Sequence, residues 1–388
     1  MIPLSYNFRS IFRRRVTAIA TSMGLGLVVF VFAAVMMVAN GVQKTLKSTG
    51  SPGNAILLRK GSTSELTSFI SRDGAKTFAA DPSVAQSGGK AMASPELYVI
   101  QQLERIDNSG PANVGFRGFT QDGYELVRKP TIHIIEGRLP AAGTSELMIG
   151  KAARGRYAGA ELGESLKKAR REWKVVGVFE SGGSSAESEI WADADQLAQA
   201  MNRTSGYSSM TVRLRDPSDL GQLKTVVDAD PRFNLEAKRE DVYYEENSGQ
   251  LAGFIKGLGI FIAIFFAFGA TLGAMITMYG QVASRLREIG TLRALGFQRR
   301  TVLLSFLIES LILSVLGAAA GCALASFLGK VSFTTVNFGN FTETKFQLAF
   351  SPNVAIGSSL FAVGMGLFGG LLPAIRAARL PIVEASKG

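Results

Sequence analysis

The sequence predicts a membrane protein with four transmembrane α-helices and a large extracytoplasmic α+β domain inserted between helices 1 and 2. Two observations lead to this fold class. Of the 388 residues, 47% are hydrophobic, and the apolar residues gather in four long runs, each longer than the roughly 18 residues that mark a spanning helix. Basic residues gather beside the ends of these runs, which is the pattern of cytoplasmic loops.

The four apolar runs define the predicted spanning helices. They are residues 16–39, 251–280, 302–329 and 352–376. The first run is longer than the apolar core of a cleaved signal peptide, about 7–15 residues, so we expect an uncleaved anchor. Helix 2 is longer than the roughly 20 residues that a bilayer needs. Its excess length predicts a stalk extension outside the membrane.

The placement of charge predicts the orientation. Twelve of the 42 Lys and Arg residues, but two of the 31 Asp and Glu residues, lie in 1–15, 280–301 and 376–388. These segments are therefore expected to be cytoplasmic: an amphipathic segment at 1–15, a loop at 281–301 and a tail at 377–388. The net charge of +11 thus belongs to membrane-flanking loops rather than to a nucleic-acid surface, and no nucleic-acid partner is expected.

The extracytoplasmic side is predicted to hold residues 40–250, together with a short outer loop at 330–351. Runs rich in β-branched residues predict strands, and apolar periodicity predicts helices. The expected strands are 55–58, 96–100, 114–119, 173–179 and 210–214. The expected helices are 65–79, 193–201 and 220–229.

Motifs for catalysis or metal binding do not appear in the sequence. It has neither a G-x-S-x-G elbow nor an H-E-x-x-H pair, and one cysteine and one histidine exclude a disulfide framework and a multi-histidine zinc site. Residues 239–246 contain four carboxylates, for which a solvated stalk base is favoured over a cation site. The Gly/Ser-rich segment 181–188 is expected to be a flexible loop rather than a ligand gate.

Two features of the spanning helices predict tight packing and a buried charge. Gly-x-x-x-Gly pairs place two glycines on one helix face, where another backbone can approach. Glu309 is the one charge inside the apolar stretches 16–39, 257–280, 302–329 and 355–375, which by default suggests function. It lies near the cytoplasmic end, so a structural role, pairing with an arginine of the loop, is favoured. The glycine pairs are Gly253 and Gly257, Gly269 and Gly273, Gly317 and Gly321, and Gly366 and Gly370.

The cytoplasmic loop contains a predicted amphipathic helix at residues 284–297. Its leucines and isoleucine recur at three-residue spacing, arginines occupy the other face, and Gly296 ends it. From these residues alone, a helix lying at the membrane surface is the simplest interpretation.

The same stretch resembles a known family. The sequence SRLREIGTLRALGFQRRTVLLSFLIESLILSVLGAAAG (284–321) is similar to the core signature of MacB/FtsX-type ABC transporter permeases, and LLPAIRAARLPIVEA (371–385) is similar to the ending of that family. The resemblance implies a half-transporter that pairs with a second permease copy, as a homodimer or with a paralogue. It also implies a bacterial cytoplasmic (inner) membrane location with both termini cytoplasmic.

By this resemblance the loop helix is a coupling helix docked on an ABC ATPase subunit. The implied contacts are Arg285, Arg287, Glu288, Gly290, Arg293, Leu295 and Gly296. No P-loop motif, G-x-x-x-x-G-K-[ST], occurs in the sequence, so the chain is not expected to be an enzyme. ATP and Mg are expected on the partner, with no cofactor in this chain. A periplasmic membrane-fusion adaptor and the lipid bilayer are the other expected partners.

The function that the resemblance implies is export or efflux by mechanotransmission. ATP binding on the partner would change the shape of the extracytoplasmic domain through the coupling helix and the spanning helices. Three alternatives remain open: lipoprotein release, as by LolC-like permeases; FtsX-like signalling to cell-wall hydrolases; and a membrane-anchored receptor that uses no ATP.

Overall fold

The computed structural model describes residues 14–337 and 340–379. The chain divides into two compact units. The helical unit comprises residues 1–40, 253–331 and 348–388, and the sheet unit comprises residues 41–252 and 332–347. Most of the predicted amphipathic segment 1–15 and of the tail 377–388 lies outside the described residues.

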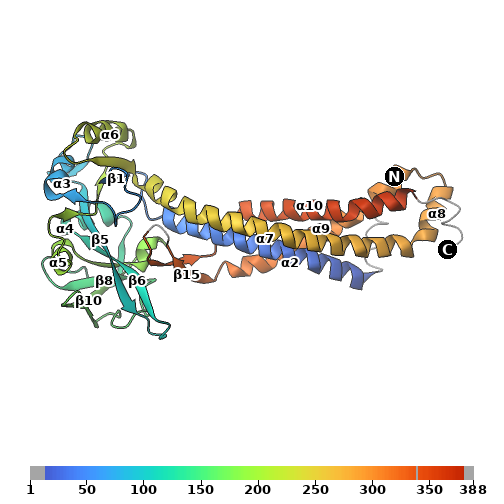
Figure 1. Ribbon diagram of the computed structural model, residues 1–388, viewed down its shortest axis with the longest axis horizontal. Helices are drawn as coiled ribbons and strands as arrows, with labels where there is room; N and C mark the ends of the chain where they lie inside the picture. Colours follow the sequence, from blue (N-terminus) through green and yellow to red (C-terminus); the bar gives the residue numbers. More distant parts are fainter. Residues whose placement is uncertain (1–13, 338–339, 380–388) are drawn as a thin grey trace. The chain divides into compact units, whose positions relative to one another are not determined.

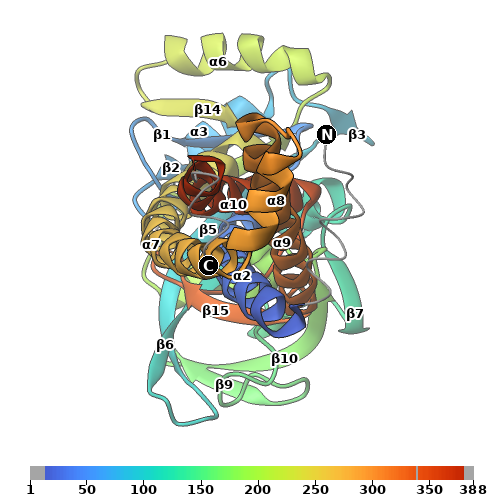
Figure 2. The ribbon, with the colours of Figure 1, turned by 90° about the vertical axis from the view of Figure 1, so that its right-hand side faces the viewer.

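Four long helices carry the apolar runs. They are α2 (Arg15–Lys47), α7 (Glu240–Ser284), α9 (Arg299–Leu328) and α10 (Pro352–Arg379). Each is long and apolar enough to cross a membrane, and in the helical unit they run side by side (Figures 1 and 2). The prediction of four spanning helices with an α+β domain between the first two is therefore confirmed. Helix α7 begins at Glu240, eleven residues before the predicted start of helix 2.

The helical unit buries small residues and exposes large apolar ones. Its interior includes Val29, Ala318 and Ala362, each at most 5% exposed. On α7, by contrast, Phe265 and Phe268 are 66% and 67% exposed. A soluble protein would bury such side chains, so this outward face matches a surface that meets lipid.

The sheet unit is built on one ten-stranded mixed sheet. Its strand order is β14-β1-β13-β5-β6-β11-β8-β10-β7, with β9 paired to β10. The strands β6 and β11, and β8 and β10, are parallel, and the other pairs are antiparallel. The ten strands are β1 (Asn54–Arg59), β5 (Ala93–Glu104), β6 (Pro111–Phe119), β7 (His133–Gly137), β8 (Glu146–Gly150), β9 (Ser165–Lys168), β10 (Arg171–Glu180), β11 (Ile190–Asp193), β13 (Ser209–Arg213) and β14 (Leu235–Arg239).

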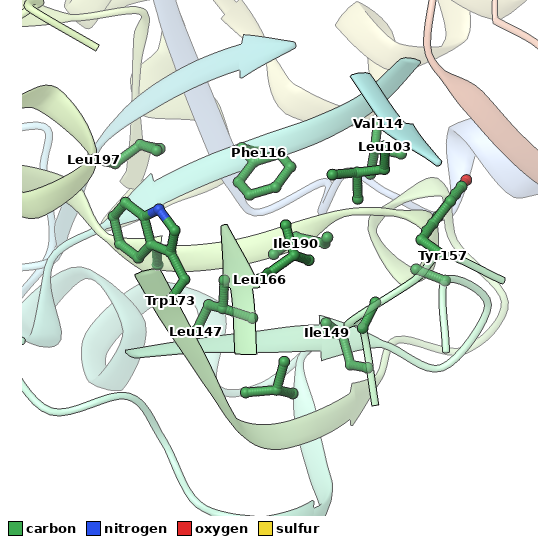
Figure 3. Close-up of a cluster of buried hydrophobic side chains, with 14 of the residues drawn as sticks. Leu103, Val114, Phe116, Leu147, Ile149, Tyr157, Leu166, Trp173, Ile190 and Leu197 are labelled. Carbon is green, nitrogen blue, oxygen red and sulfur yellow. The ribbon is translucent and has the colours of Figure 1, made fainter. Parts of the chain in front are cut away.

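Two of the apolar clusters in the described part of the sheet unit, one toward each end of the sheet, define two lobes. The first lobe packs β1, β13 and β14 against α3 (Arg72–Ala79) and α6 (Leu220–Ala229). The second packs β6, β8, β10 and β11 against α5 (Ala194–Ala200). Figure 3 shows its side chains, among them Phe116, Ile190 and Trp173. Strands β5 and β6 pair where the lobes meet. The predicted helix at 65–79 begins only at Arg72, after the Ser71 N-cap, whose hydroxyl accepts from the Gly74 amide.

The predicted outer loop 330–351 contains a β-hairpin that belongs to the sheet unit. Its strands are β15 (Ser332–Val336) and β16 (Glu343–Gln347). Phe346 is fully buried. The Glu343 carboxylate accepts from Arg105, from Arg156 Nη2 at 2.8 Å and from the Tyr157 hydroxyl at 3.0 Å. These partners are about 190 to 240 positions away in sequence, so no local pattern could indicate them.

The structure bears on two expectations about polar segments. The solvated base holds for Glu245 and Glu246, whose side chains are 38% and 56% exposed, but not for Glu240 and Asp241. These two are 1% and 6% exposed, and they accept from Arg128 and Arg239, respectively. Segment 181–188 is an ordered turn ending in a 3-10 helix (Ser185–Ser188). The Glu187 carboxylate holds it by accepting from two backbone amides at 2.8 Å.

Candidate functional site

The cytoplasmic loop forms one short helix, α8 (Leu286–Ala294). It follows α7 after a single residue. Beyond its C-cap Leu295, Gly296 has a φ of +92°, a backbone conformation that suits glycine. Ile289 is buried in an apolar cluster with Val302 and Phe306 of α9. The helix is therefore packed against the helical unit through one face, which leaves its other face open.

Arg285 and Glu309 form a buried ion pair beneath this helix. The guanidinium donates from Nη1 and Nη2 to the two carboxylate oxygens at 2.9 and 3.1 Å, and it lies over the Phe306 ring at 5.8 Å. Both side chains are less than 10% exposed. The structure thus shows the pairing of Glu309 with a loop arginine that the sequence favoured. It also joins the start of α8 to α9 at a fixed position.

The other predicted contact residues divide by burial. Arg287, Glu288, Leu295 and Gly296 are exposed, whereas Gly290 is buried and Arg293 is half-buried. Leu295 is 72% exposed. The Arg285 guanidinium is turned toward Glu309, away from any partner. The ATPase contact of these residues stays a prediction.

The glycine pairs behave differently on different helices. A Cβ on Gly321 of α9 would lie 2.5 Å from the Gly26 carbonyl of α2, and one on Gly370 of α10 would lie 2.5 Å from the Ser310 side chain of α9. These pairs, with Gly317 and Gly366, allow close packing inside the chain. The paired glycines of α7, in contrast, have no atom within 4 Å of the added Cβ; they are Gly253, Gly257, Gly269 and Gly273.

One close approach was missed by the sequence analysis. A Cβ on Gly259 of α7 would lie 1.8 Å from Val35 Cγ1 of α2. Gly259 is not part of a Gly-x-x-x-Gly pair, so the spacing rule did not select it. A single glycine facing a β-branched residue on the neighbouring helix gives no local signal.

The sheet unit holds a polar cavity of about 680 Å³. Its walls carry Lys151 and Glu180, which form an ion pair at 3.1 Å, and His133 and Lys345 from two other strands. The turn at 181–183 forms part of the rim. The cavity has the size of a small-molecule site, with a mixed and mainly polar lining.

Family comparisons agree with this architecture. The family described as MacB-like periplasmic core domain matches residues 17–229. The family described as FtsX-like permease C-terminal matches residues 260–382, which hold α8, α9 and α10. The fold and the loop helix define a membrane permease with an inserted sheet domain. The chain belongs to the MacB/FtsX-type family of ABC transporter permeases.

Curated relatives fall into two kinds. The chain is 27% identical over 237 residues to the macrolide export ATP-binding/permease protein MacB of Neisseria meningitidis, which covers 58% of this chain and 35% of that protein. It is 27% identical over 413 residues to the uncharacterized ABC transporter permease YvrN of Bacillus subtilis, which covers 98% of this chain and 97% of that protein. The match thus spans about a third of the MacB relative and nearly all of YvrN.

Solved structures of related domains are more distant. The periplasmic region of MacB from Actinobacillus actinomycetemcomitans has a TM-score of 0.38 and 13% identity, covering 49% of this chain and 90% of that chain. The extracellular domain of the noncanonic ABC-type transporter YknZ from Gram-positive bacteria has a TM-score of 0.35 and 12% identity, covering 48% and 99%.

Proposed function

We propose that the chain is the permease subunit of an exporter driven by a separate ABC ATPase. ATP binding and hydrolysis on that partner would move α8, and the motion would change the shape of the sheet unit on the far side of the membrane. The chain itself would transport by this mechanical coupling and would bind neither ATP nor Mg. Export accords with the relatives named for macrolide export.

The observation that carries this proposal is the continuity of α7. This helix has 45 residues, from Glu240 in the sheet unit to Ser284, which directly precedes Arg285, the N-cap of α8. At 1.5 Å per residue it is about 68 Å long, roughly twice the hydrocarbon thickness of a bilayer. One helix therefore belongs to both the inserted domain and the loop that would meet the ATPase.

The proposal includes the orientation and the assembly. The three basic segments favour a cytoplasmic face for α8 and for both termini, in a bacterial inner membrane. The open glycine face of α7 favours a second permease copy as its neighbour. A periplasmic adaptor of the membrane-fusion type would be a further partner for an exporter of this kind.

Co-purification tests the proposal directly. The full chain, expressed from its own gene neighbourhood and extracted in mild detergent, should retain a P-loop ATPase. The double variant Arg287→Ala/Glu288→Ala, on the open face of α8, should lower the retained ATPase at least tenfold. A matched double variant that removes the same charges from the sheet unit, Glu164→Ala/Lys167→Ala, should retain it. If no ATPase is retained, or the α8 variant binds it like the wild type, the proposed function is wrong.

A further inference from the structure

The sheet unit contains a cluster of buried charges to which the proposed function gives no role. Two arginines and four glutamates are each less than 9% exposed. Burying charges is costly, and apolar packing of the same volume is often as stable, so stability alone does not account for the cluster. We call it the ionic hub; its members are Glu65, Glu96, Arg117, Arg128, Glu189 and Glu240.

Arg117 of β6 occupies the centre of the ionic hub. Its Nε and Nη2 donate to Glu189 at 2.8 and 3.1 Å. Its Nη1 and Nη2 donate to Glu65 at 2.8 and 2.9 Å, and Nη1 also donates to Glu96 at 2.7 Å. All five N–H donors of the guanidinium are thus engaged. Because the guanidinium is planar and hydrogen-bonded at every donor, it fixes the positions of the three carboxylates around it.

Arg128 connects this centre to the first residue of α7. Its Nε and Nη2 donate to the Glu96 carboxylate at 2.6 and 2.9 Å, and its Nη1 donates to Glu240. The Glu240 carboxylate also accepts from the Ser51 amide at 3.0 Å. The start of α7 is therefore joined to the middle strands of the sheet through two arginines in series.

The hairpin β15–β16 reaches the same centre by a second route. The Asn340 amide donates to the Tyr98 hydroxyl at 2.9 Å, and the Tyr98 ring lies 4.8 Å from the Arg117 guanidinium carbon. The Lys345 backbone amide donates to the Ser188 hydroxyl, directly before the hub glutamate, at 3.0 Å. Both contacts come from the segment that connects α9 to α10.

The end of α2 provides a third route. Thr49, two residues beyond this helix, shares a hydrogen bond of 2.8 Å with the Ser185 hydroxyl and accepts from the Ser185 amide at 3.1 Å. Ser185 opens the 3-10 helix that ends one residue before Glu189. The chain passes between its two units after residues 40, 252, 331 and 347, and every one of these passages has a connection to the ionic hub.

The position and chemistry of the ionic hub suit a mechanical joint. It lies on β5 and β6, where the two lobes meet, and on the segments beside these strands. Glu96 and Arg117 alternate along the strands with Leu97 and Phe116, so the ionic hub occupies the face of the sheet opposite the apolar clusters of the two lobes. Apolar surfaces can slide past one another, whereas a saturated set of charged hydrogen bonds is directional. Burial tends to raise the pKa of Glu96, but Arg128 and Arg117 lower it to about 2, so this central link is ionised at neutral pH.

We propose that the ionic hub is the joint that converts movement of α7 and of the hairpin into relative movement of the two lobes. Its six residues act as positioning residues: they pass displacement on and contact neither nucleotide nor substrate. The proposal rests on the proposed function, since it requires that the ATPase moves the helices.

The experiment measures lobe movement in the full chain, bound to its co-purified ATPase in lipid nanodiscs. Cys322 is replaced by alanine, and spin labels are placed at Lys167→Cys on β9 and Lys224→Cys on α6, which are exposed positions on opposite lobes. A non-hydrolysable ATP analogue should shift the distance between the labels. Glu240→Gln should reduce that shift at least twofold while the ATPase rate changes less than twofold. The partner still hydrolyses ATP, but the charged link between Arg128 and the start of α7 is weakened.

Controls separate a joint from a merely stabilising cluster. Leu197→Ala weakens the second lobe without touching the ionic hub and should keep the shift; Trp191, whose Nε1 donates to Glu189 at 2.9 Å, reports folding by fluorescence. Should Glu240→Gln fail to fold, Asn340→Ala removes the Tyr98 contact, together with two hydrogen bonds that Asn340 accepts from Thr342 inside the hairpin. It leaves all six hub residues in place and should also reduce the shift. If a folded Glu240→Gln variant, or Asn340→Ala in its place, keeps the full shift, the ionic hub is not the joint. If the wild type shows no shift, the proposed function itself fails, and the joint with it.

Discussion

At the scale of the residue, buried ion pairs are the features that distinguish this chain. Glu309 stands out in the sequence because it is the one carboxylate in the spanning runs, and the structure pairs it with Arg285. The hub residues Arg117 and Glu96 do not stand out in the same way, because charged residues in a mixed-charge insertion are ordinary. Their burial results from folding, which brings strands and loops that are distant in sequence together around them.

Breaking the membrane ion pair should destabilise the helical unit. Glu309→Gln leaves the Arg285 guanidinium buried with a weaker partner, so we expect a loss of about 3–5 kcal/mol in the free energy of unfolding. Denaturant titration of the full chain in detergent measures it. The double replacement Arg285→Met/Glu309→Leu removes both charges and should cost far less. An unchanged unfolding free energy for Glu309→Gln would contradict the buried pairing.

Acid should unfold the sheet unit through carboxylates with lowered pKa values. Opposing burial, the arginines lower the pKa of Glu96 to about 2, and the Arg138 hydrogen bond lowers the pKa of Glu146 to about 2. Both are lowered below the unfolded value of about 4.3, so their stabilisation is complete above that value and is lost as pH falls toward 2. For Glu96 the loss is about 3 kcal/mol.

Tryptophan fluorescence measures this acid transition, since both tryptophans, Trp173 and Trp191, are buried in the sheet unit. Glu146→Gln should remove only the part of the acid-induced loss of stability that comes from Glu146, and leave the part that comes from Glu96. Glu189 acts with the opposite sign, because burial raises its pKa and its contribution is lost as pH rises. A stability that stays constant between pH 4 and pH 2 would refute the assignment.

At the scale of the element, α7 and the hairpin β15–β16 are the two parts whose extent the sequence analysis underestimated. Hydropathy located helix 2 from Leu251, but α7 begins at Glu240, whose carboxylate looks solvated in the sequence and is buried against Arg128 in the structure. The hairpin has strand-like residues, yet a segment between two spanning helices is too short to suggest a domain contact. Glu343 joins it to the sheet unit.

Loosening the hairpin should be visible by hydrogen exchange. Glu343→Gln removes a carboxylate that is bound by Arg105, Arg156 and Tyr157. Charged hydrogen bonds contribute about 1.5–3 kcal/mol each in net stability, so amide exchange in 332–347 should accelerate roughly tenfold or more. Lys345→Ala, exposed on the same strand, should leave exchange unchanged. Equal exchange in the two variants would mean that Glu343 does not hold the hairpin.

At the scale of the whole molecule, the helices present two kinds of glycine face. Gly317 and Gly321 are used within the chain, whereas Gly269 and Gly273 are open. A chain that dimerises needs an apolar face with room for a second backbone, and α7 has that face next to exposed phenylalanines. The spacing rule treated all four pairs alike, because it carries no information about which helix lies opposite.

Leucine substitutions should separate folding from dimerisation. Gly269→Leu/Gly273→Leu places side chains on the open face of α7, so the monomer should stay folded while dimer formation in detergent, followed by crosslinking, falls at least tenfold. Gly321→Leu clashes with the Gly26 carbonyl and should lower the yield of folded protein instead. A dimer that tolerates the α7 substitutions would show that the second copy packs elsewhere.

The sequence by itself determined the number of spanning helices, the position of the inserted domain, its α+β character and the family. These follow from apolar run length, from the placement of basic residues and from the motif at 284–321, all of which are local along the chain. Strands such as 114–119 and 173–179 were also found locally, because β-branched and aromatic residues alternate there.

Only the tertiary structure decided which polar residues are buried and what they join. Arg117 meets glutamates 21, 52 and 72 positions away, and Arg105 meets Glu343 at 238 positions. The energy of a charged hydrogen bond depends on the geometry and burial of both partners, and neither is encoded at one position. The separation of one insertion into two lobes around a central joint is likewise a property of the folded sheet and not of any segment within it.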